Sequence, residues 1–408
     1  LVPTLPDLGL TPSSRAGGAT AMAQGTALAT TYNSSLFGGL TQLGLRVIPL
    51  DTFRFLQEVV ANPALFGIVN VTGTACQPQI TAQSLTCNPS SLVSPNAPSS
   101  YLFADGVHPT TGAHKVIADF AISVIEGPRM MGILPHSAAM VGRARAQMVE
   151  GAFSSMAAGE GTHWWASVRG DNQRYVDAPF FFDGPGVTGS FGLGRRSGNV
   201  VYGAFAGYGR QDIDFGQRRG SFEQTDAGFG GYLGVRGDAF WANVQASWTQ
   251  LDFDVTRQVH LGPATRQHRG APGGDNFSMG ASMGLDLTHG RLVHGPVVSL
   301  LAQRITVDGF DEDSTESTAL GYSEQDGGSL VGSVGWQGSF ALNDRLRPYA
   351  RLTWDHEFEE APEEVFARSR SMPTTLPYAV PGLPFDDSYG TLTYGVRTTL
   401  WGLDVTTG

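Results

Sequence analysis

The chain has 408 residues, of which 54 are glycine, with a net charge of −11 and only 15% charged residues. A hydrophobic content of 41% excludes a disordered chain, and the acidic balance argues against a nucleic-acid partner, which a basic patch would normally mark. The length allows two or three ordinary domains, or one small domain beside one large barrel.

The composition of the chain changes near residue 135. Residues 1–135 resemble an ordinary α/β chain, whereas residues 136–408 hold 41 of the glycines, and all seven tryptophans lie beyond residue 163. No apolar run reaches the ~18 residues of a membrane-spanning helix, so none is predicted. We therefore expect two parts of different architecture that meet near residue 135.

The first part holds the two cysteines of the chain. Cys76 and Cys87 lie in a loop rich in Gln, Asn, Pro and Ser. Exactly two cysteines in an exported chain predict a disulfide between them. A metal site would need further His or Cys ligands nearby, and none cluster there in the sequence. We expect a disulfide in this loop, no metal and no cofactor.

The first part also contains a candidate catalytic pair. Asp105 and His108 lie three residues apart, in a loop that opens a helix predicted over 112–125. A carboxylate at this reach can accept a hydrogen bond from the imidazole Nδ1–H, which leaves Nε2 free as a general base. Such a pair needs a nucleophile. The alternative interpretation is an aspartate that caps the helix beside a solvent-facing histidine.

A second helix is predicted from about residue 137 to residue 156. Its small or flexible apolar residues repeat every four positions, as on one face of a helix. They are Met140, Ala144, Met148 and Ala152. A helix with so few large apolar residues suits the polar lumen of a barrel, or else the surface of the first domain; the pattern does not choose between these two positions.

The second part alternates polar and apolar residues with period two, which is typical of strands. In 240–249, for example, Phe240, Val244 and Trp248 fall on one face, and Asn243 falls on the other. Ten candidate strands follow this pattern. They occupy about 164–170, 186–195, 199–212, 221–236, 240–249, 277–289, 292–307, 329–340, 346–355 and 391–400.

These strands predict an outer-membrane barrel. All but one span ten or more residues, whereas strands of soluble proteins average about 5–6 residues and a bilayer-spanning strand needs ~9–11. Their second face carries Arg, Asp and Gln, which suits a polar interior under an apolar exterior. A soluble β-sandwich or lipocalin-like barrel is the alternative architecture.

The segments around the strands also fit such a barrel. Short turns alternate with long polar loops, predicted at 255–274, 308–327 and 359–387. The acids of 311–313 are expected to be solvated loop charge. Five tryptophans near strand ends are assigned to aromatic girdles: Trp164, Trp165, Trp248, Trp354 and Trp401.

The stretch from Asp105 to Thr110, Asp-Gly-Val-His-Pro-Thr, carries a family resemblance. With Gly112 and the Ile-Ala-Asp that ends at Asp119, it resembles the last conserved block of the GDSL (SGNH) esterases and lipases. Together with the lone helix and the glycine-rich barrel, it resembles the GDSL esterase autotransporters of Gram-negative bacteria. The resemblance implies a multidomain chain: the C-terminal end of an α/β SGNH-hydrolase passenger, a linking helix and a transmembrane antiparallel β-barrel of twelve strands.

The resemblance also implies a function. It implies a surface-anchored carboxylic ester hydrolase, with His108 as the base and Asp105 as its orienting partner. The protein would lie in the outer membrane with the passenger facing the cell exterior. Its partners would be a lipid or ester substrate, outer-membrane lipid and the barrel-assembly machinery. The implied division is 1–128 for the passenger, 129–160 for the linker and pore helix, and 161–408 for the barrel.

The chain departs from the family pattern at several points. No Gly-Asp-Ser occurs, so the nucleophilic serine, and the oxyanion-hole Gly and Asn, are expected to precede residue 1. About ten strands are present instead of twelve, which would leave unpaired edges in lipid. We therefore expect a fragment truncated at both ends and inactive on its own.

The sequence offers one other candidate nucleophile and one alternative function. Ser282 lies in a Gly-x-Ser-x-Gly sequence, but this motif needs a strand–turn–helix context, and Ser282 falls inside an alternating strand. We assign it to the barrel wall. The alternative function for the whole chain is a non-catalytic outer-membrane barrel, a porin or an adhesin, with an extracellular cap.

Overall fold

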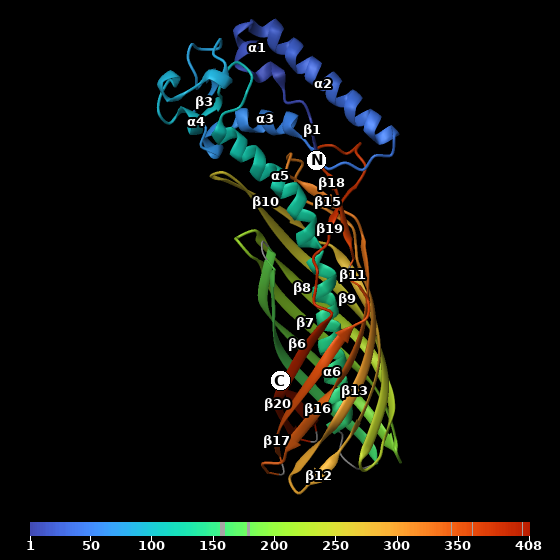
Figure 1. Cartoon of the computed structure of the whole chain (residues 1–408). Helices are drawn as coiled ribbons and strands as arrows, with labels where there is room; N and C mark the ends of the chain where they lie inside the picture. Colours follow the sequence, from blue (N-terminus) through green and yellow to red (C-terminus); the bar gives the residue numbers. More distant parts are fainter. Residues whose placement is uncertain (156–159, 178–179, 344, 361, 402) are drawn as a thin grey trace.

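A computed structural model describes residues 1–155, 160–177, 180–343, 345–360, 362–401 and 403–408. The N-terminal segment, residues 1–110, forms a cap on one end of a long barrel (Figure 1). Two consecutive helices run from the cap into the barrel (Figure 1). We call the barrel end below the cap the capped end and the opposite end, with its short connections, the turn end.

The cap is built from short elements around one long helix. They are β1 (Val2–Pro3), η1 (Leu8–Leu10), α1 (Pro12–Ala16), α2 (Gly18–Gln42), β2 (Pro49–Leu50), α3 (Thr52–Ala61), η2 (Pro63–Phe66), β3 (Asn70–Thr74), η3 (Ser84–Thr86), η4 (Pro89–Ser91), α4 (Ala97–Ser100) and β4 (Tyr101–Phe103). Parallel pairs join β1 to β2 and β3 to β4. The aromatic rings of Phe55 on α3 and Phe120 on the next helix lie 4.7 Å apart, so the cap packs directly on the helix that leaves it.

Helix α5 (Thr111–Met131) and helix α6 (Ile133–Ser155) connect the cap to the barrel. Thr110 caps α5 by accepting a hydrogen bond from the Ala113 N–H at 3.2 Å. Helix α6 lies inside the barrel and contacts strands around its wall (Figure 1), so the lumen interpretation of this helix is correct. The predicted end at Met156 falls outside the described residues. No described helix is long and apolar enough to span a membrane.

Eleven strands close the barrel among the described residues. They are β5 (Gly161–Asp177), β6 (Phe180–Ser197), β7 (Val200–Phe215), β8 (Gly220–Arg236), β9 (Phe240–Leu261), β11 (Gly273–Leu285), β13 (Leu292–Val307), β16 (Gln325–Phe340), β17 (Leu346–Glu357), β20 (Ser388–Leu400) and β21 (Leu403–Thr407). All ten predicted strands are present, and β21 is the additional one.

Strand β21 pairs with β5 and closes the wall. The other neighbours are antiparallel, but Leu403–Thr407 runs parallel to Trp164–Val168. An odd number of up-and-down strands makes the first and the last point the same way, so they can meet only in parallel. The expectation of unpaired edges holds only in part, because this short strand pairs with Val396–Leu400 of β20 and Trp164–Val168 of β5 and covers these portions of the two edges.

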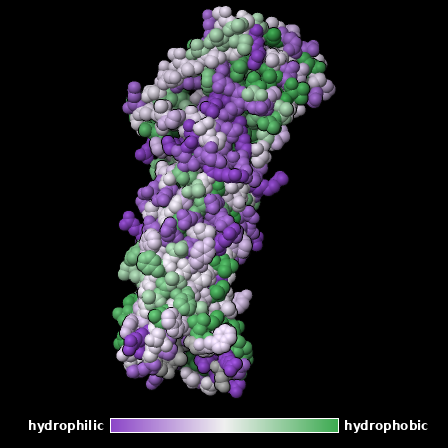
Figure 2. All heavy atoms as spheres, turned by 180° about the vertical axis from the view of Figure 1, so that it is seen from behind, coloured by the Kyte–Doolittle hydropathy of each residue, from purple (hydrophilic) through white to green (hydrophobic). Residues whose placement is uncertain are grey.

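The two faces of the wall differ in polarity as predicted. Val244, Leu300 and Leu352 point outward and are 48–60% exposed, whereas Asn243 and Thr353 point inward and are each 4% exposed. Figure 2 shows hydrophobic side chains concentrated over the lower part of the barrel, with a hydrophilic zone between them and the cap. This lower exterior is an apolar surface suited to lipid.

The polarity of the wall inverts toward the capped end. On the upper part of β9, Leu251, Phe253 and Val255 are buried inside, while Asp252 and Asp254 are exposed outside. The inner residues join one apolar cluster with α5 and the first turns of α6. The barrel therefore has a polar lumen below and a core like that of a water-soluble protein above.

Of the three segments predicted as loops, 255–274 is mostly strand, whereas 308–327 and 359–387 are mostly irregular and contain short strands. Residues 255–274 form the end of β9 and its partner β10, and residues 308–327 and 359–387 supply a four-stranded sheet in the order β14-β15-β18-β19. The bounds are β10 (Ala264–Gly270), β14 (Phe310–Asp311), β15 (Leu320–Tyr322), β18 (Glu364–Ser369) and β19 (Tyr378–Pro381); a short β12 (Leu287–His289) extends the wall at the turn end. Strands of two to six residues, such as β14, β15, β18 and β19, are too short for a clear alternation, so the sequence did not predict them.

Two residues lie where the sequence did not predict them. Trp165 is not in a girdle: it points inward, is 3% exposed, and donates its indole N–H to the Tyr232 hydroxyl at 3.2 Å. Glu312 is not solvated: it is buried and accepts two hydrogen bonds from Arg257 at 2.6 and 2.7 Å. The remaining assigned tryptophans are exposed, as a girdle requires: Trp164, Trp248, Trp354 and Trp401.

Ion pairs fasten α6 to the wall of the lumen. They join Arg143 to Glu357, Arg145 to Asp226 and Glu150 to Arg351. Arg145 and Asp226 are each 1% exposed, and Arg145 also donates to the Thr249 hydroxyl at 2.6 Å. Since charges that lose water must be paired, these contacts hold the helix in one position.

Carboxamides of the wall also reach the backbone of α6. Asn276 and Gln303 donate to the carbonyls of Ala138 and Ala139, both at 3.2 Å. A Cβ at Gly142 would lie 2.0 Å from Oε1 of Gln303, so the absence of a side chain there permits the contact. Helix α6 and the barrel wall are therefore in direct contact at this level of the lumen.

Removing one member of the buried pair should destabilise the barrel strongly. In Asp226→Asn, the Arg145 guanidinium stays buried without its counter-charge, which costs about 3–5 kcal/mol. We expect a lower midpoint for unfolding in urea, followed by tryptophan fluorescence. The control is Asp212→Asn, which removes an exposed partner of Arg210 and should leave the midpoint unchanged. Equal midpoints for the two variants would contradict this role of the pair.

Candidate active site

The candidate catalytic residues lie in a tight loop between β4 and α5. The Ala104 N–H donates to the His108 carbonyl at 2.7 Å, and the Thr110 N–H donates to the Leu102 carbonyl at 3.0 Å. These bonds fold the segment back on the end of the strand before the helix begins. Asp105 and His108 are therefore held between two regular elements.

Asp105 is buried and fully hydrogen-bonded. Its carboxylate accepts backbone N–H groups from Ser84 at 2.9 Å, Val107 at 2.9 Å and His108 at 2.8 Å. Burial acts to raise the pKa of Asp105, but the backbone hydrogen bonds and the bond from the His108 side chain hold that pKa well below its usual range. The residue is therefore a carboxylate in the working range of pH. It does not cap α5, because Thr110 does so.

His108 presents one ring nitrogen to Asp105 and the rest of its ring to solvent. Nδ1 lies 2.8 Å from Oδ2 of Asp105, and the side chain is 68% exposed. Since an ionised carboxylate only accepts, Nδ1 carries the proton and donates it. Nε2 then has a free lone pair and no hydrogen-bond partner among the described residues. This arrangement can accept a proton from a hydroxyl that approaches from outside.

An apolar cavity of about 260 Å³ lies beside the imidazole. His108 and Val107 form part of its wall, and the rest comes mainly from the N-terminal segment, α3, β4 and α5. The apolar lining includes Leu8, Phe55, Val59 and Leu102. The cavity can receive an apolar group next to Nε2. In the part of the chain that the structure describes, no serine hydroxyl hydrogen-bonds to His108.

The disulfide supports the site from one side. Cys76 and Cys87 are bonded to one another, and the loop that they close contains Ser84, whose N–H holds Asp105. The Cys76 N–H also donates to the Ala104 carbonyl at 2.9 Å. The sequence predicts the bond between the cysteines but contains no signal for the contribution of Ser84.

Two other candidate sites are resolved by the structure. Ser282 lies within β11 and faces the lumen, with Asn243 and Ser299 opposite it on the neighbouring strands. A nucleophile elbow is therefore absent at this serine. Within the described ranges, no group of three or more His, Cys, Asp or Glu residues is placed to hold a metal ion.

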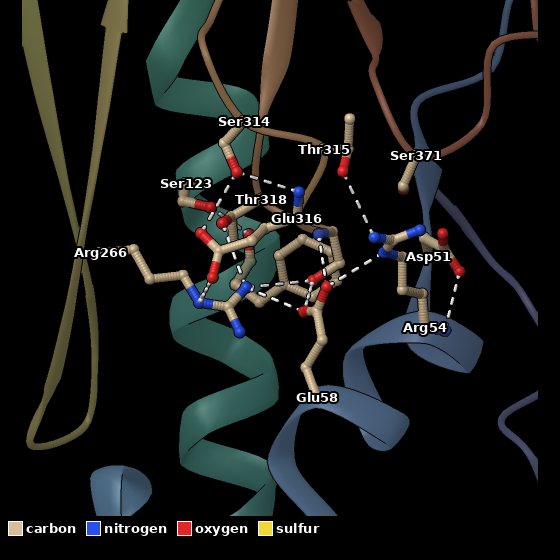
Figure 3. Close-up of polar contacts among 12 residues, drawn as sticks. Asp51, Arg54, Glu58, Ser123, Arg266, Ser314, Thr315, Glu316, Thr318 and Ser371 are labelled. Carbon is tan, nitrogen blue, oxygen red and sulfur yellow. Dashed lines mark hydrogen bonds and ion pairs between the residues drawn. The ribbon is translucent and has the colours of Figure 1, made fainter. Parts of the chain in front are cut away.

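Polar contacts fix the cap to the barrel at a second place besides α5 (Figure 3). Glu58 of α3 accepts hydrogen bonds from Ser317 at 2.5 and 3.0 Å and from Arg266 of β10 at 2.9 Å. Arg54 extends this cluster, with its Nε 3.2 Å from Glu58. Together with α5, this cluster sets the position of the catalytic loop relative to the barrel.

Comparisons with known proteins agree with both parts of the chain. Residues 164–405 match the family model described as the autotransporter beta-domain. The chain is 29% identical over 387 residues to Esterase EstA of Pseudomonas aeruginosa, covering 90% of this chain and 59% of the relative. It is 24% identical to Lipase 1 of Photorhabdus luminescens over 355 residues, covering 83% of this chain and 51% of the relative.

A solved structure supports the fold. The translocator domain of autotransporter NalP from Neisseria meningitidis superposes with a TM-score of 0.52 at 16% identity, covering 65% of this chain and 85% of that one. This likeness concerns the barrel architecture alone. The present chain spans about three fifths of the length of the EstA relative.

Loss of the disulfide should loosen the loop that holds Asp105. A bond that closes about a dozen residues stabilises by roughly 3 kcal/mol. In a Cys76→Ser/Cys87→Ser variant, we expect chymotrypsin to cleave after Leu85, which is 95% exposed, at least several-fold faster than in the parent protein. Cleavage after Leu342, in a turn of the barrel, serves as the internal reference. An unchanged rate at Leu85 would count against the support that we assign to the disulfide.

The stability that Asp105 contributes should depend on pH in one direction. Because its pKa is lowered on folding, the contribution is complete above the ordinary aspartate pKa of about 3.9 and is lost as the pH falls toward the lowered pKa. The difference in thermal midpoint between the parent protein and Asp105→Asn should narrow as the pH falls below about 4. A difference that stayed the same or widened between about pH 4 and pH 2 would be inconsistent with this environment.

Proposed function

The chain belongs to the autotransporter family, and on that premise we propose that it carries part of the catalytic machinery of a surface-displayed carboxylic ester hydrolase. As an autotransporter barrel, it resides in the outer membrane. The proposal rests above all on the Asp105–His108 pair, in a loop that continues directly into the helix that enters the barrel. The EstA and Lipase 1 relatives add support, since their names denote ester-cleaving enzymes.

The proposed chemistry is that of a serine hydrolase. A serine hydroxyl attacks the ester carbonyl while Nε2 of His108 takes its proton, and the imidazolium then returns a proton to the leaving alcohol. Asp105 fixes the tautomer of His108 and stabilises the imidazolium by its charge. The apolar cavity beside His108 offers a wall for an apolar part of the substrate, such as a lipid acyl chain.

We also propose that the nucleophile and the oxyanion-hole donors come from the whole protein outside these 408 residues. Two observations support this. No Gly-Asp-Ser occurs in the sequence, and no serine hydroxyl of the described residues bonds to His108. The chain alone would then bind no reactive ester carbonyl in the required geometry. In the same proposal, boundaries at residues 128 and 160 separate the passenger, the linker and the barrel.

The orientation in the membrane follows the same proposal. The cap and the long strand extensions lie at one end, and the short turns lie at the other; in outer-membrane barrels, long connections face the exterior. The cap would therefore face the cell exterior, after insertion by the barrel-assembly machinery. A porin is disfavoured because α6 fills the lumen and is tied there by buried ion pairs.

The test is ester hydrolysis by the whole protein displayed on a Gram-negative host. We expect His108→Ala to lower kcat/KM for a short-chain aryl ester by about 10²–10⁴-fold, because the general base is lost. The matched control is His114→Ala, which changes an exposed histidine in the first turn of α5, six residues after His108, and should keep full activity. Heat-dependent gel mobility would show that each barrel has folded. Full activity in folded His108→Ala would refute the assignment and favour a non-catalytic barrel.

A further inference from the structure

A cavity of about 240 Å³ lies between α6 and the wall of the barrel at the turn end. Among the described residues, its lining contains six arginines and two aspartates. The arginines are Arg169, Arg236, Arg345, Arg347, Arg351 and Arg397. The protein as a whole carries a net charge of −11, so this concentration of positive charge runs against the overall balance.

Two of these arginines face one another directly. Arg347 of β17 and Arg397 of β20 occupy paired positions on adjacent strands, and both line the cavity. The guanidinium of Arg397 lies 4.4 Å from the ring centre of Tyr349. Neither arginine forms a hydrogen bond or an ion pair with a described residue. Nε of Arg397 is buried without a partner, and so is Nη1 of Arg236 across the cavity.

The nearby carboxylates are already engaged elsewhere. Asp286 pairs with Arg236 at 2.9 Å, and Glu150 of α6 pairs with Arg351 at 2.8 Å. Asp404 accepts a hydrogen bond from the Thr399 hydroxyl at 2.9 Å. None of them forms an ion pair or a hydrogen bond with Arg347 or Arg397, although Asp286 lies close enough to attract Arg397 electrostatically.

The paired guanidiniums of Arg347 and Arg397 are unfavourable unless a negative charge neutralises them. Like charges directly opposite one another on neighbouring strands destabilise a sheet, and a polar atom that is buried without a partner is unfavourable. A lysine or a carboxyl group could change its protonation state, but a guanidinium stays charged in proteins. A bound anion would supply the compensating charge.

We propose that this cavity is a binding site for a phosphate-type anion. The planar fork of a guanidinium matches the oxygens of a phosphate, and a tetrahedral anion can contact the neighbouring guanidiniums of β17 and β20 at once. The exposed side chains of Arg345 and Arg347 form an accessible rim at the turn end. Bound phosphate would join these two strands beside the last turns of α6. Its source is either free phosphate or the headgroup of a phospholipid.

The first experiment measures thermal unfolding of the purified, detergent-solubilised chain. It compares sodium phosphate with sodium chloride of equal ionic strength. Phosphate should raise the midpoint of the parent protein. In Arg347→Gln/Arg397→Gln, the repulsion is gone, so the midpoint in chloride should rise above that of the parent, and the extra gain in phosphate should vanish. Calorimetric titration with inorganic phosphate should show affinity weakened at least about tenfold.

The control is Arg210→Gln, which removes an exposed arginine on the outer face of β7 and should respond to phosphate as the parent does. Native mass spectrometry of the extracted protein then separates the two sources. Phospholipid bound to the parent and lost from the double variant identifies the headgroup; a phosphate response without bound lipid identifies free phosphate. An identical response of the parent and the double variant to phosphate, with no bound lipid in either, would overturn the proposal.

Discussion

The architecture depends on one constraint: a chain that crosses lipid as strands must pair every backbone N–H and C=O group within its own wall. Eleven strands meet this requirement over most of the wall by closing on themselves, and the odd number makes the last contact, between the short β21 and β5, parallel. Closure creates an interior that no lipid reaches. That interior can hold charged residues only if each is paired, which is why α6 is bound there by ion pairs and by carboxamides that reach its carbonyls.

The same wall changes its character where it leaves the membrane. Along β9, the residues that face inward pass from Asn243 and Thr249 to Leu251 and Phe253, and the outward ones pass from Trp248 to Asp252. Above that level, water instead of lipid surrounds the barrel, so apolar residues move inside and form a core around α5. The candidate catalytic loop leads directly into the helix that forms this core. The Asp105–His108 pair, with hydrogen bonds of 2.8–2.9 Å, thus lies at the start of α5, where Ser84 and the disulfide support it.

Much of this was predictable from residues of one strand or one loop. Alternation predicted ten of the strands, and the Asp-x-x-His spacing predicted a hydrogen bond that needs only local geometry. Most of the incorrect predictions concern residues whose partners lie far away in the sequence. β21 has five residues, too few for a clear pattern. Trp165 and Tyr232, far apart in sequence, meet inside the lumen. Glu312, in a segment that resembled a solvated loop, is buried because Arg257 of another strand reaches it.

The sequence by itself determined the two-part organisation, the inverted polarity of the barrel and the identity of the Asp105–His108 pair, because period, composition and short spacings are properties of neighbouring residues. Only the tertiary structure decided that the second helix occupies the lumen, that a parallel contact closes the wall, that Ser84 completes the environment of Asp105, and that Arg347 and Arg397 face each other without an ion-pair partner among the described residues. Each of these four features depends on which distant residues are brought together. Strand register and helix position determine these long-range contacts, and no local sequence pattern encodes them.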